Sequence, residues 1–132
     1  MLANVPAAAY YETVNIEING ELVYIPAEYG AVMIVGDRTM VPVRFVSEFL
    51  NFSVIWVEEV QMVVFSNYAH MLSFQIGGNI LFSMMDDRQI EMDAPAMIYN
   101  DRSYIPIRFF AENTGYTVNW NEYTRTVSLT RN

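Results

Sequence analysis

Residues 37–45 read DRTMVPVRF, and residues 101–109 read DRSYIPIRF. The two stretches lie 64 positions apart, and the match runs without a gap from residues 36–65 onto residues 100–129, with 10 identities in 30 aligned positions. A repeat period of this length is typical of a supersecondary unit and is too long for one turn of a solenoid. The sequence therefore predicts that one folding unit occurs twice in the chain.

Each stretch contains a proline that predicts the start of a helix. Proline fixes φ at about −65° and lacks an N–H group that the first helical turn would leave unpaired, and it keeps the preceding residue extended. After each proline, apolar residues recur at the spacing of one helix face. We therefore predict amphipathic helices at about residues 42–50 and 106–114, with Pro42 and Pro106 in their first turns.

Alternation of apolar and polar residues predicts strands on both sides of each helix. Asn19-Gly20 separates two such runs, which is the strongest short-range signal for a hairpin, and Asp86-Asp87 holds the same place in the second copy. An additional strand at residues 71–76 should precede the second hairpin. The strands expected after the helices are residues 53–57, 61–65, 117–121 and 125–129.

These elements place the chain in the α+β class. We expect two pseudo-symmetric repeats, each an antiparallel sheet of hairpins wrapped around one amphipathic helix. Residues 14–66 would form the first repeat and residues 67–132 the second, with residues 1–13 as an N-terminal tail or the remnant of a leader. Residues 66–70 are the only candidate linker, and because this segment is short we expect the repeats to pack as one unit.

The charge balance excludes several classes of function. The 132 residues include seven basic and 15 acidic side chains, which gives a formal net charge of −8. Such a surface repels phosphate backbones, so we expect no nucleic-acid partner. Charges interrupt every apolar stretch well before the roughly 18 residues of a membrane span, so we expect no membrane insertion. The absence of cysteine excludes disulfides and thiolate metal sites.

Few residues suit catalytic chemistry. His70 is the one histidine, and no phosphate-binding loop or zinc-protease motif occurs. The carboxylate pairs Glu58-Glu59 and Asp86-Asp87 lie in expected turns, where solvation works against the raised pKa that a glycosidase acid requires. We therefore predict no enzyme activity, no catalytic residues and no cofactor.

Metal binding has two alternatives, neither of which we favour. Calcium would have to use three carboxylates that lack the dense spacing of a calcium loop, those of Asp86, Asp87 and Asp93. His70 with Met71, or the pair Met84-Met85, would suit Cu(I). Nine methionines in so apolar a chain are better explained as core residues. We predict no metal site.

The order of turn, proline, arginine, glutamate and tryptophan at fixed offsets resembles the repeat of the copper amine oxidase N-terminal-like, or stalk, domain. The residues that carry this motif are Pro42, Arg44, Glu48 and Trp56 in the first copy and Pro106, Arg108, Glu112 and Trp120 in the second. The resemblance covers nearly all of residues 14–130. It implies an antiparallel sheet wrapped around a helix, on secreted or cell-surface proteins chiefly of Gram-positive bacteria.

The resemblance does not imply copper. A copper amine oxidase needs three histidine ligands and a tyrosine, in an Asn-Tyr-Asp or Asn-Tyr-Glu context, that is oxidised to the quinone cofactor. This chain has only His70, and its Asn67-Tyr68 is followed by Ala69. The oxidase site cannot be assembled within one such chain.

The motif residues are expected to have structural roles. Arg44 with Glu48, and Arg108 with Glu112, are spaced for exposed i,i+4 ion pairs worth about 0.3–0.5 kcal/mol, in preference to anion clamps. The two tryptophans are expected to cover the helices as core residues, with sugar stacking as the alternative.

Two functions remain. The first is a noncatalytic structural or interaction module of an extracellular or cell-surface bacterial protein, for spacing, docking or dimerisation. Open sheet edges, and possible exchange of the strand at residues 71–76, lead us to expect a homodimer. The second is a carbohydrate-binding module for cell-wall or plant polysaccharide. The candidate contacts in either case are tyrosines expected on the surface: Tyr24, Tyr29, Tyr99, Tyr104 and Tyr116.

Overall fold

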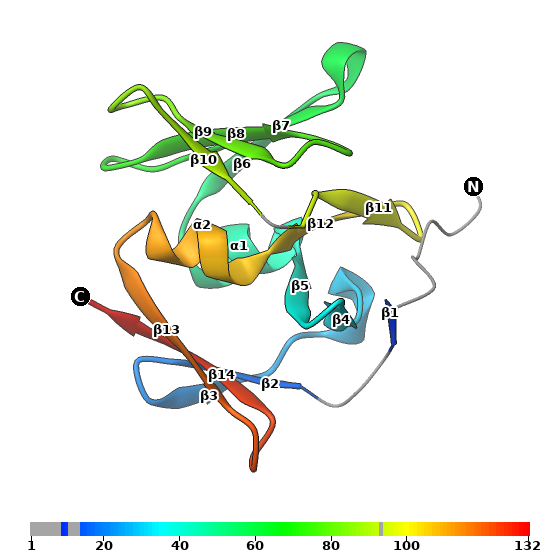
Figure 1. Ribbon diagram of the computed structural model, residues 1–132, viewed down its shortest axis with the longest axis vertical. Coiled ribbons are helices and arrows are strands. Elements are labelled where there is room, and N and C mark those ends of the chain that lie inside the picture. Colours follow the sequence, from blue (N-terminus) through cyan, green and yellow to red (C-terminus); the bar gives the residue numbers. More distant parts are fainter. Residues whose placement is uncertain (1–8, 11–13, 93) are drawn as a thin grey trace.

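The computed structural model describes residues 9–10, 14–92 and 94–132. In Figure 1 the two helices lie between a sheet at the top and a sheet at the bottom, and a third sheet extends to one side of them. We refer to these as the upper, lower and middle sheets. None of the described helices is long and apolar enough to cross a membrane.

The middle sheet contains the strands that lead into the helices. β5 (Arg38–Pro42) pairs antiparallel with β12 (Arg102–Pro106). Helix α1 (Val43–Phe49) follows β5 directly, and helix α2 (Ile107–Glu112) follows β12. The other strands of this sheet are β4 (Met33–Val35) beside β5, β1 (Ala9–Tyr10) beside β4, and β11 (Met97–Tyr99) beside β12.

Pro42 and Pro106 each end a strand and cap a helix. Their φ angles of −62° and −63° suit a helix, but their ψ angles of 142° and 119° are extended. The helices therefore begin one residue later than predicted, because Pro42 stays paired with Tyr104 and Pro106 with Met40 in the middle sheet. Both helices also end slightly earlier than predicted.

The upper sheet is an antiparallel meander. Its strands in order are β6 (Ser53–Val57), β7 (Met62–Ser66), β8 (Met71–Gln75), β9 (Ile80–Ser83) and β10 (Arg88–Glu91). The short 3-10 helix η2 (Glu58–Val60) joins β6 to β7. Residues 66–70, the expected linker, form the tight turn into β8, where the Asn67 carboxamide oxygen accepts hydrogen bonds from the backbone N–H groups of Ala69 and His70 at 2.9 and 2.7 Å.

The turn at Asp86-Asp87 is longer than predicted. β9 ends at Ser83, which pairs with Arg88, so the turn spans residues 84–87 instead of two residues. The Asp86 carboxylate accepts hydrogen bonds from the Ser83 hydroxyl and the Arg88 guanidinium. These two bonds hold residues 84–87 in a turn, so β9 ends at Ser83, before it reaches the pair of aspartates.

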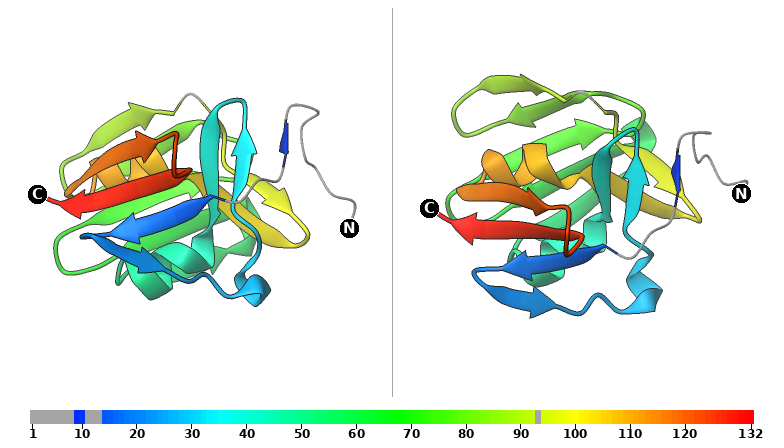
Figure 2. Two further views of the ribbon diagram at one scale, coloured as in Figure 1. Left: turned by 90° about the horizontal axis from the view of Figure 1, so that it is seen from below. Right: turned by 60° about the horizontal axis from the view of Figure 1, so that its bottom comes forward.

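The lower sheet combines strands from both ends of the chain, as Figure 2 shows. Its order is β13 (Tyr116–Asn121), β14 (Thr126–Arg131), β2 (Asn15–Ile18) and β3 (Glu21–Val23). The Asn19-Gly20 hairpin is confirmed, with left-handed φ angles of 51° and 86°. The expectation of purely antiparallel pairing is wrong between β14 and β2, which run parallel, because no hairpin fixes the direction of strands so distant in the sequence.

The upper and lower sheets each contain strands from both predicted repeats, whose boundary lies between residues 66 and 67. The β2–β3 hairpin lies beside β14, and β8, β9 and β10 extend the sheet that β6 and β7 begin. The α+β class is confirmed. Of the predicted tail at residues 1–13, only β1 falls within the described residues.

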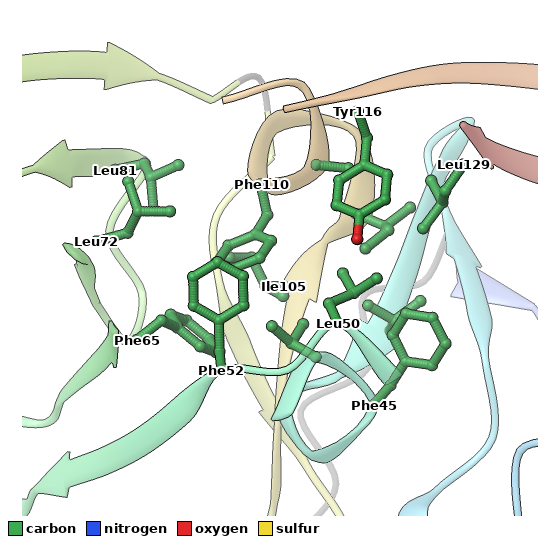
Figure 3. Packing of buried hydrophobic residues seen from close by; sticks show 14 of the residues in the cluster. Phe45, Leu50, Phe52, Phe65, Leu72, Leu81, Ile105, Phe110, Tyr116 and Leu129 are labelled. Atoms are coloured by element: carbon green, nitrogen blue, oxygen red, sulfur yellow. The ribbon is translucent and has the colours of Figure 1, made fainter. Parts of the chain in front are cut away.

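The helices are buried in a core that is rich in aromatic rings (Figure 3). Phe110 of α2 packs edge-on against Phe65 of β7 and against Phe52, with ring centroids 4.8 and 5.0 Å apart. Phe45 and Val46 of α1 are fully buried in the same cluster. Each such side chain contributes about 1.5–3 kcal/mol by leaving water. One core therefore joins the helices to all the sheets.

Candidate functional site

A groove of about 510 Å³ opens beside the first turn of α2. Residues of α2, of the turn between β4 and β5, and of the β13–β14 hairpin line it. Ile107, Val118 and Val127 supply apolar surface, and Arg38 and Arg108 supply charge. A hollow of this volume suits a small ligand or a few residues of a peptide.

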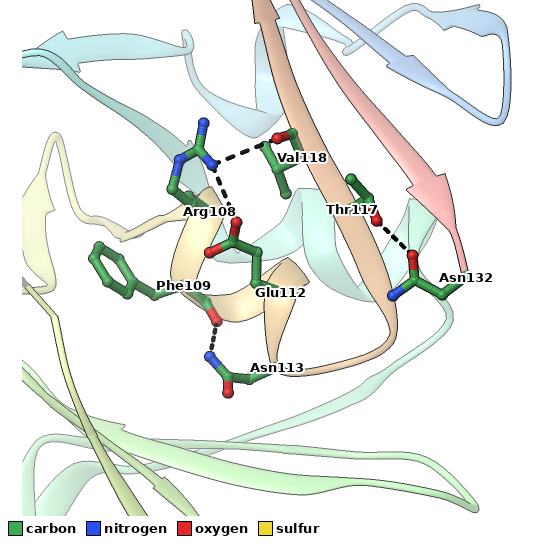
Figure 4. Close-up of polar contacts among 7 residues, drawn as sticks. All are labelled: Arg108, Phe109, Glu112, Asn113, Thr117, Val118 and Asn132. Atoms are coloured by element: carbon green, nitrogen blue, oxygen red, sulfur yellow. Dashed lines mark hydrogen bonds and ion pairs between the residues drawn. The ribbon is translucent and has the colours of Figure 1, made fainter.

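Two contacts fix Arg108 at the groove (Figure 4). Its Nη1 donates to the Glu112 carboxylate at 3.0 Å, which is the predicted i,i+4 ion pair, and to the Val118 carbonyl oxygen at 3.4 Å. The ion pair is solvated and contributes only a few tenths of a kcal/mol. The second contact joins α2 to the edge strand β13.

Arg38 reaches the groove from the turn between β4 and β5. Gly36 in this turn has a left-handed φ of 52°, and the Arg38 Nη1 donates to its carbonyl oxygen at 2.9 Å. Arg102 makes the same contact with its own turn, from Nη1 to the Asn100 carbonyl oxygen at 3.3 Å. The repeated sequence thus holds both arginines in the same way.

Trp120 also lines the groove and is 38% exposed, so the prediction of a core role is wrong. Tyr116 and Val118 on the same face of β13 are buried against the helices, but Trp120 lies beyond the part of the strand that packs on them. The Arg125 guanidinium lies 5.1 Å from its ring centroid. The prediction is wrong for Trp56 as well, which is 42% exposed near the end of β6.

The tyrosines expected as contacts do not form one exposed surface. Tyr104 and Tyr116 are 1% and 5% exposed, so the expectation of exposure is wrong for both: their rings pack in the interior and their hydroxyls have hydrogen-bond partners. Tyr29 and Tyr99 are half-buried, and Tyr24 is exposed. The row of exposed rings that a sugar platform requires is therefore not made by these five residues.

Tyr104, Arg131 and Asp86, all in the described part of the chain, have shifted pKa values. Burial raises the pKa of the Tyr104 hydroxyl. The hydrogen bond with the Tyr116 hydroxyl raises the pKa of Arg131. Hydrogen bonds from Ser83 and Arg88 lower the pKa of the Asp86 carboxyl, which is the opposite of the shift that a glycosidase acid needs.

Metal ligands are not gathered in the described part of the chain, where no three His, Cys, Asp or Glu side chains are placed to hold an ion. Asp93, one of the calcium candidates, lies outside the described residues. His70 packs against Phe52, with ring centroids 6.4 Å apart. An oxidase copper site needs three histidines, so a chain with one does not fit it.

The groove has a counterpart in the other half of the chain. At the offset of 64 residues, Arg102 matches Arg38 and Arg44 matches Arg108. Arg102 begins β12 and Arg44 lies in α1, just as their matches begin β5 and lie in α2. The two pairs of arginines therefore provide a direct comparison of two sites.

A segment of the chain itself occupies the counterpart. The 3-10 helix η1 (Ala27–Tyr29) lies there: Arg102 donates to the Glu28 carbonyl oxygen from Nη2 at 3.0 Å and from Nε at 3.3 Å. The Arg44 guanidinium lies over the Tyr29 ring, 4.3 Å from its centroid. One arginine thus binds a backbone oxygen while the other stacks on an aromatic ring.

The upper sheet carries apolar residues on both of its faces. Phe65, Phe74 and Leu81 point into the core and are fully buried, so the residues that alternate with them point outward. We call the apolar residues on that outward side the upper outer face: Ile55, Val57, Met62, Val64, Met71, Ile80 and Phe82. Ile55 is 58% exposed and Phe82 is 37% exposed, so this apolar surface is in contact with solvent.

The outward side of the lower sheet is polar. Its residues on β13 and β14, the lower outer face, are Thr117, Asn119, Asn121, Thr126, Ser128 and Thr130. At the offset of 64, Asn119 stands where the upper sheet has Ile55, and Ser128 stands where it has Val64. Sequence reasoning missed the upper outer face, although the lack of alternation in β6 (SVIWV) is a signal for it.

Comparison with known proteins gives one family. Residues 17–129 match the family described as Copper amine oxidase N-terminal domain, while no curated protein and no solved structure matches the chain. That domain is the noncatalytic part of copper amine oxidases, and the match includes no catalytic domain. Because the match covers most of the 132 residues, the chain belongs to the copper amine oxidase N-terminal domain family.

Proposed function

We propose that the chain is a noncatalytic interaction module of a secreted or cell-surface bacterial protein, and that it dimerises through the upper outer face. The observation that carries the proposal is the exposure of apolar side chains on the outward side of four neighbouring strands, β6 to β9. Several exposed apolar side chains on one face of a sheet are uncommon on monomers and are typical of contact sites. The extracellular location is inferred from the resemblance to stalk domains.

A second copy of the chain is the partner that suits this face. Among its outward-pointing residues the only charge is Glu91, on the edge strand β10. Two chains that each carry a net charge of −8 can therefore meet here without bringing clusters of carboxylates together. The interior position of β8, between β7 and β9, favours this face-to-face contact over exchange of that strand.

The dimer should be weak. Five strands at a spacing of about 4.8 Å, with four or five residues each at about 3.4 Å, give a face of roughly 19 by 14 to 17 Å. Two such faces, with their side chains, bury an area near the lower limit for specific interfaces, about 1,000 Å² in total. We therefore expect a dissociation constant in the micromolar range.

The proposal includes an internal symmetry. Val41 pairs with Ile105, its own match at the offset of 64, and Met40 and Pro42 pair with the matches of one another, Pro106 and Tyr104. This register is what a two-fold axis between β5 and β12 requires. It supports the proposal that the halves are pseudo-symmetric copies that share the middle sheet.

Sedimentation equilibrium tests the proposed dimer. The wild-type mass should rise from one chain of 15.2 kDa towards twice that value as the concentration increases to about 1 mM. The double variant Ile55→Asn/Val64→Ser, which installs the lower-sheet residues on the upper sheet, should remain a monomer. A matched control, Asn119→Ala/Ser128→Ala on the lower outer face, should dimerise as the wild type does. A wild type that stays monomeric throughout contradicts the proposal.

A further inference from the structure

The filled counterpart shows what kind of ligand a pair of arginines in this arrangement holds. In it, Arg102 binds the Glu28 carbonyl oxygen and Arg44 stacks on the Tyr29 ring. A guanidinium suits both contacts, because its N–H groups lie in one plane and its faces are free to stack on aromatic rings. The counterpart is therefore a peptide site whose occupant is covalently attached.

Segment lengths differ between the two sites, and among the described residues an element of the chain covers only the counterpart. The connection from β3 to β4, residues 24–32, is longer than the connection from β10 to β11, residues 92–96. The longer connection provides η1, which covers Arg44 and Arg102. The shorter one has no element equivalent to η1 among its described residues, and the groove beside α2 is open.

We infer that the groove beside α2 binds a tyrosine-containing turn of a partner protein. Arg38 would donate to a carbonyl oxygen of the turn, as Arg102 donates to that of Glu28, and Arg108 would stack on the ring. The contacts that hold Arg38 to Gly36 and Arg108 to Glu112 fix these guanidinium groups in place before a ligand arrives. This site is distinct from the upper outer face, so the inference does not depend on dimerisation.

Trp120 gives the groove a feature that favours an aromatic ligand. Its exposed ring lines the groove and also lines a second hollow on the β13–β14 hairpin. Arg125 lies over that ring in a cation–π contact. An aromatic side chain that enters beside Arg108 would therefore find a second ring surface within the same groove.

The test uses the chain's own segment as a separate peptide. ¹⁵N-labelled protein is titrated with an end-blocked peptide of residues 25–32 (IPAEYGAV) and with the same peptide carrying alanine in place of tyrosine. A cyclic form of the peptide is titrated as well, because cyclisation removes much of the ordering cost that a linear segment bears on binding. The tyrosine peptides should cause saturable shifts at amides of the groove, with a dissociation constant of about 1 mM or lower.

Matched variants locate the binding. Arg38→Ala and Trp120→Ala should each weaken binding at least tenfold. Trp56→Ala, at the matching position in the other half and with similar exposure, should leave it unchanged. Sedimentation equilibrium on the same variants should show an unaltered dimer, so failure at the groove is distinguishable from failure of the dimer.

Three outcomes overturn the inference. The first is the absence of saturable shifts with both linear and cyclic peptides, and the second is equal binding of the alanine peptide. The third is saturable binding of cello- or chito-oligosaccharides at the groove when the peptides do not bind there. That last result would assign the groove to carbohydrate, with Trp120 as the stacking platform.

Discussion

The upper and lower sheets flank the same two helices, yet their outward sides have opposite character. Their inward positions agree: Val54 matches Val118, and Phe65 matches Leu129, as the shared core requires. Their outward positions differ, with Ile55 against Asn119 in the clearest case. Packing against the helices constrains one side of each sheet, so the two halves differ in surface chemistry on the free side.

The two arginine sites show a similar divergence. The Arg44 site is covered by Tyr29 and η1, while the Arg108 site is an open groove. In both comparisons the two halves share residues at matching positions and differ at unmatched ones: the outward strand residues in the first comparison and η1 in the second. The predictions below test the shared core first and then the differences between the halves.

The shared core should respond most strongly. Phe110 contacts Phe52 and Phe65, so Phe110→Ala should lower the free energy of unfolding by about 3–5 kcal/mol. Val46→Ala, at the matching position in α1, removes fewer atoms and should cost less. Urea denaturation followed by circular dichroism measures both. Unfolding of Phe110→Ala in two separate steps would mean that the sheets do not share one core.

The filled arginine site should depend on Gly30. This glycine has a φ of 110°, and an added Cβ would lie 2.7 Å from the Tyr104 hydroxyl oxygen and from the Arg102 Cδ. Gly30→Ala should therefore cost about 2 kcal/mol or more. Gly36→Ala, which has a left-handed φ but open space around it, should cost about 1 kcal/mol. Equal losses in thermal denaturation would show that the close packing around Gly30 contributes nothing.

The contrast between the outer faces can be removed by mutation. Asn119→Ile/Ser128→Val should give the lower outer face the apolar character of the upper one. Because the two faces lie on opposite sides of the molecule, dimers should then join into longer assemblies (Figure 1). Light scattering at about 100 µM should show a mass above that of a dimer. We expect the variant to associate at least about tenfold more strongly than the wild type, which corresponds to about 1.4 kcal/mol. An unchanged dimer would show that apolar side chains alone do not create the contact.

The smallest effect concerns Tyr104, beside the filled site. Burial raises the pKa of its hydroxyl in the folded state, so the folded chain retains this proton at a pH where the unfolded chain has lost it. The associated stability is complete below the ordinary tyrosine pKa of 10.0 and is lost as pH rises through the raised folded value. Tyr104→Phe should reduce the loss of stability between pH 9 and 11, at about those values, in urea titrations. An identical loss in the variant would contradict a role for this hydroxyl.

Much of the fold was predictable because its signals are local. Pro42, Pro106 and the Asn19-Gly20 pair identify helix starts and a hairpin through their own backbone preferences. The parallel pairing of β2 with β14 was not predictable, since it joins opposite ends of the chain. The Asp86 turn was misplaced because side-chain hydrogen bonds closed it early.

The site was less predictable than the fold. The motif included Arg108 and Trp120, but the sequence alone suggested a buried tryptophan, because its position on the inward face of β13 does not reveal where the helix stops covering the strand. Tyr104 and Tyr116 were misjudged for the opposite reason, since tyrosine rings fit a core when their hydroxyls find partners. The groove and its filled counterpart could be identified only from contacts in the three-dimensional structure.

Distances between spin labels would test the dimer most directly. The chain has no cysteine, so a single Gln89→Cys on the outward side of the upper sheet, or Thr130→Cys on that of the lower sheet, can each carry one label. With sheets packed about 10 Å apart, pulsed electron paramagnetic resonance should give label pairs within about 30 Å for Gln89→Cys and at about 50 Å or more for Thr130→Cys. A short distance from Thr130→Cys, or none from Gln89→Cys at concentrations where the mass is that of a dimer, would contradict pairing through the upper outer face.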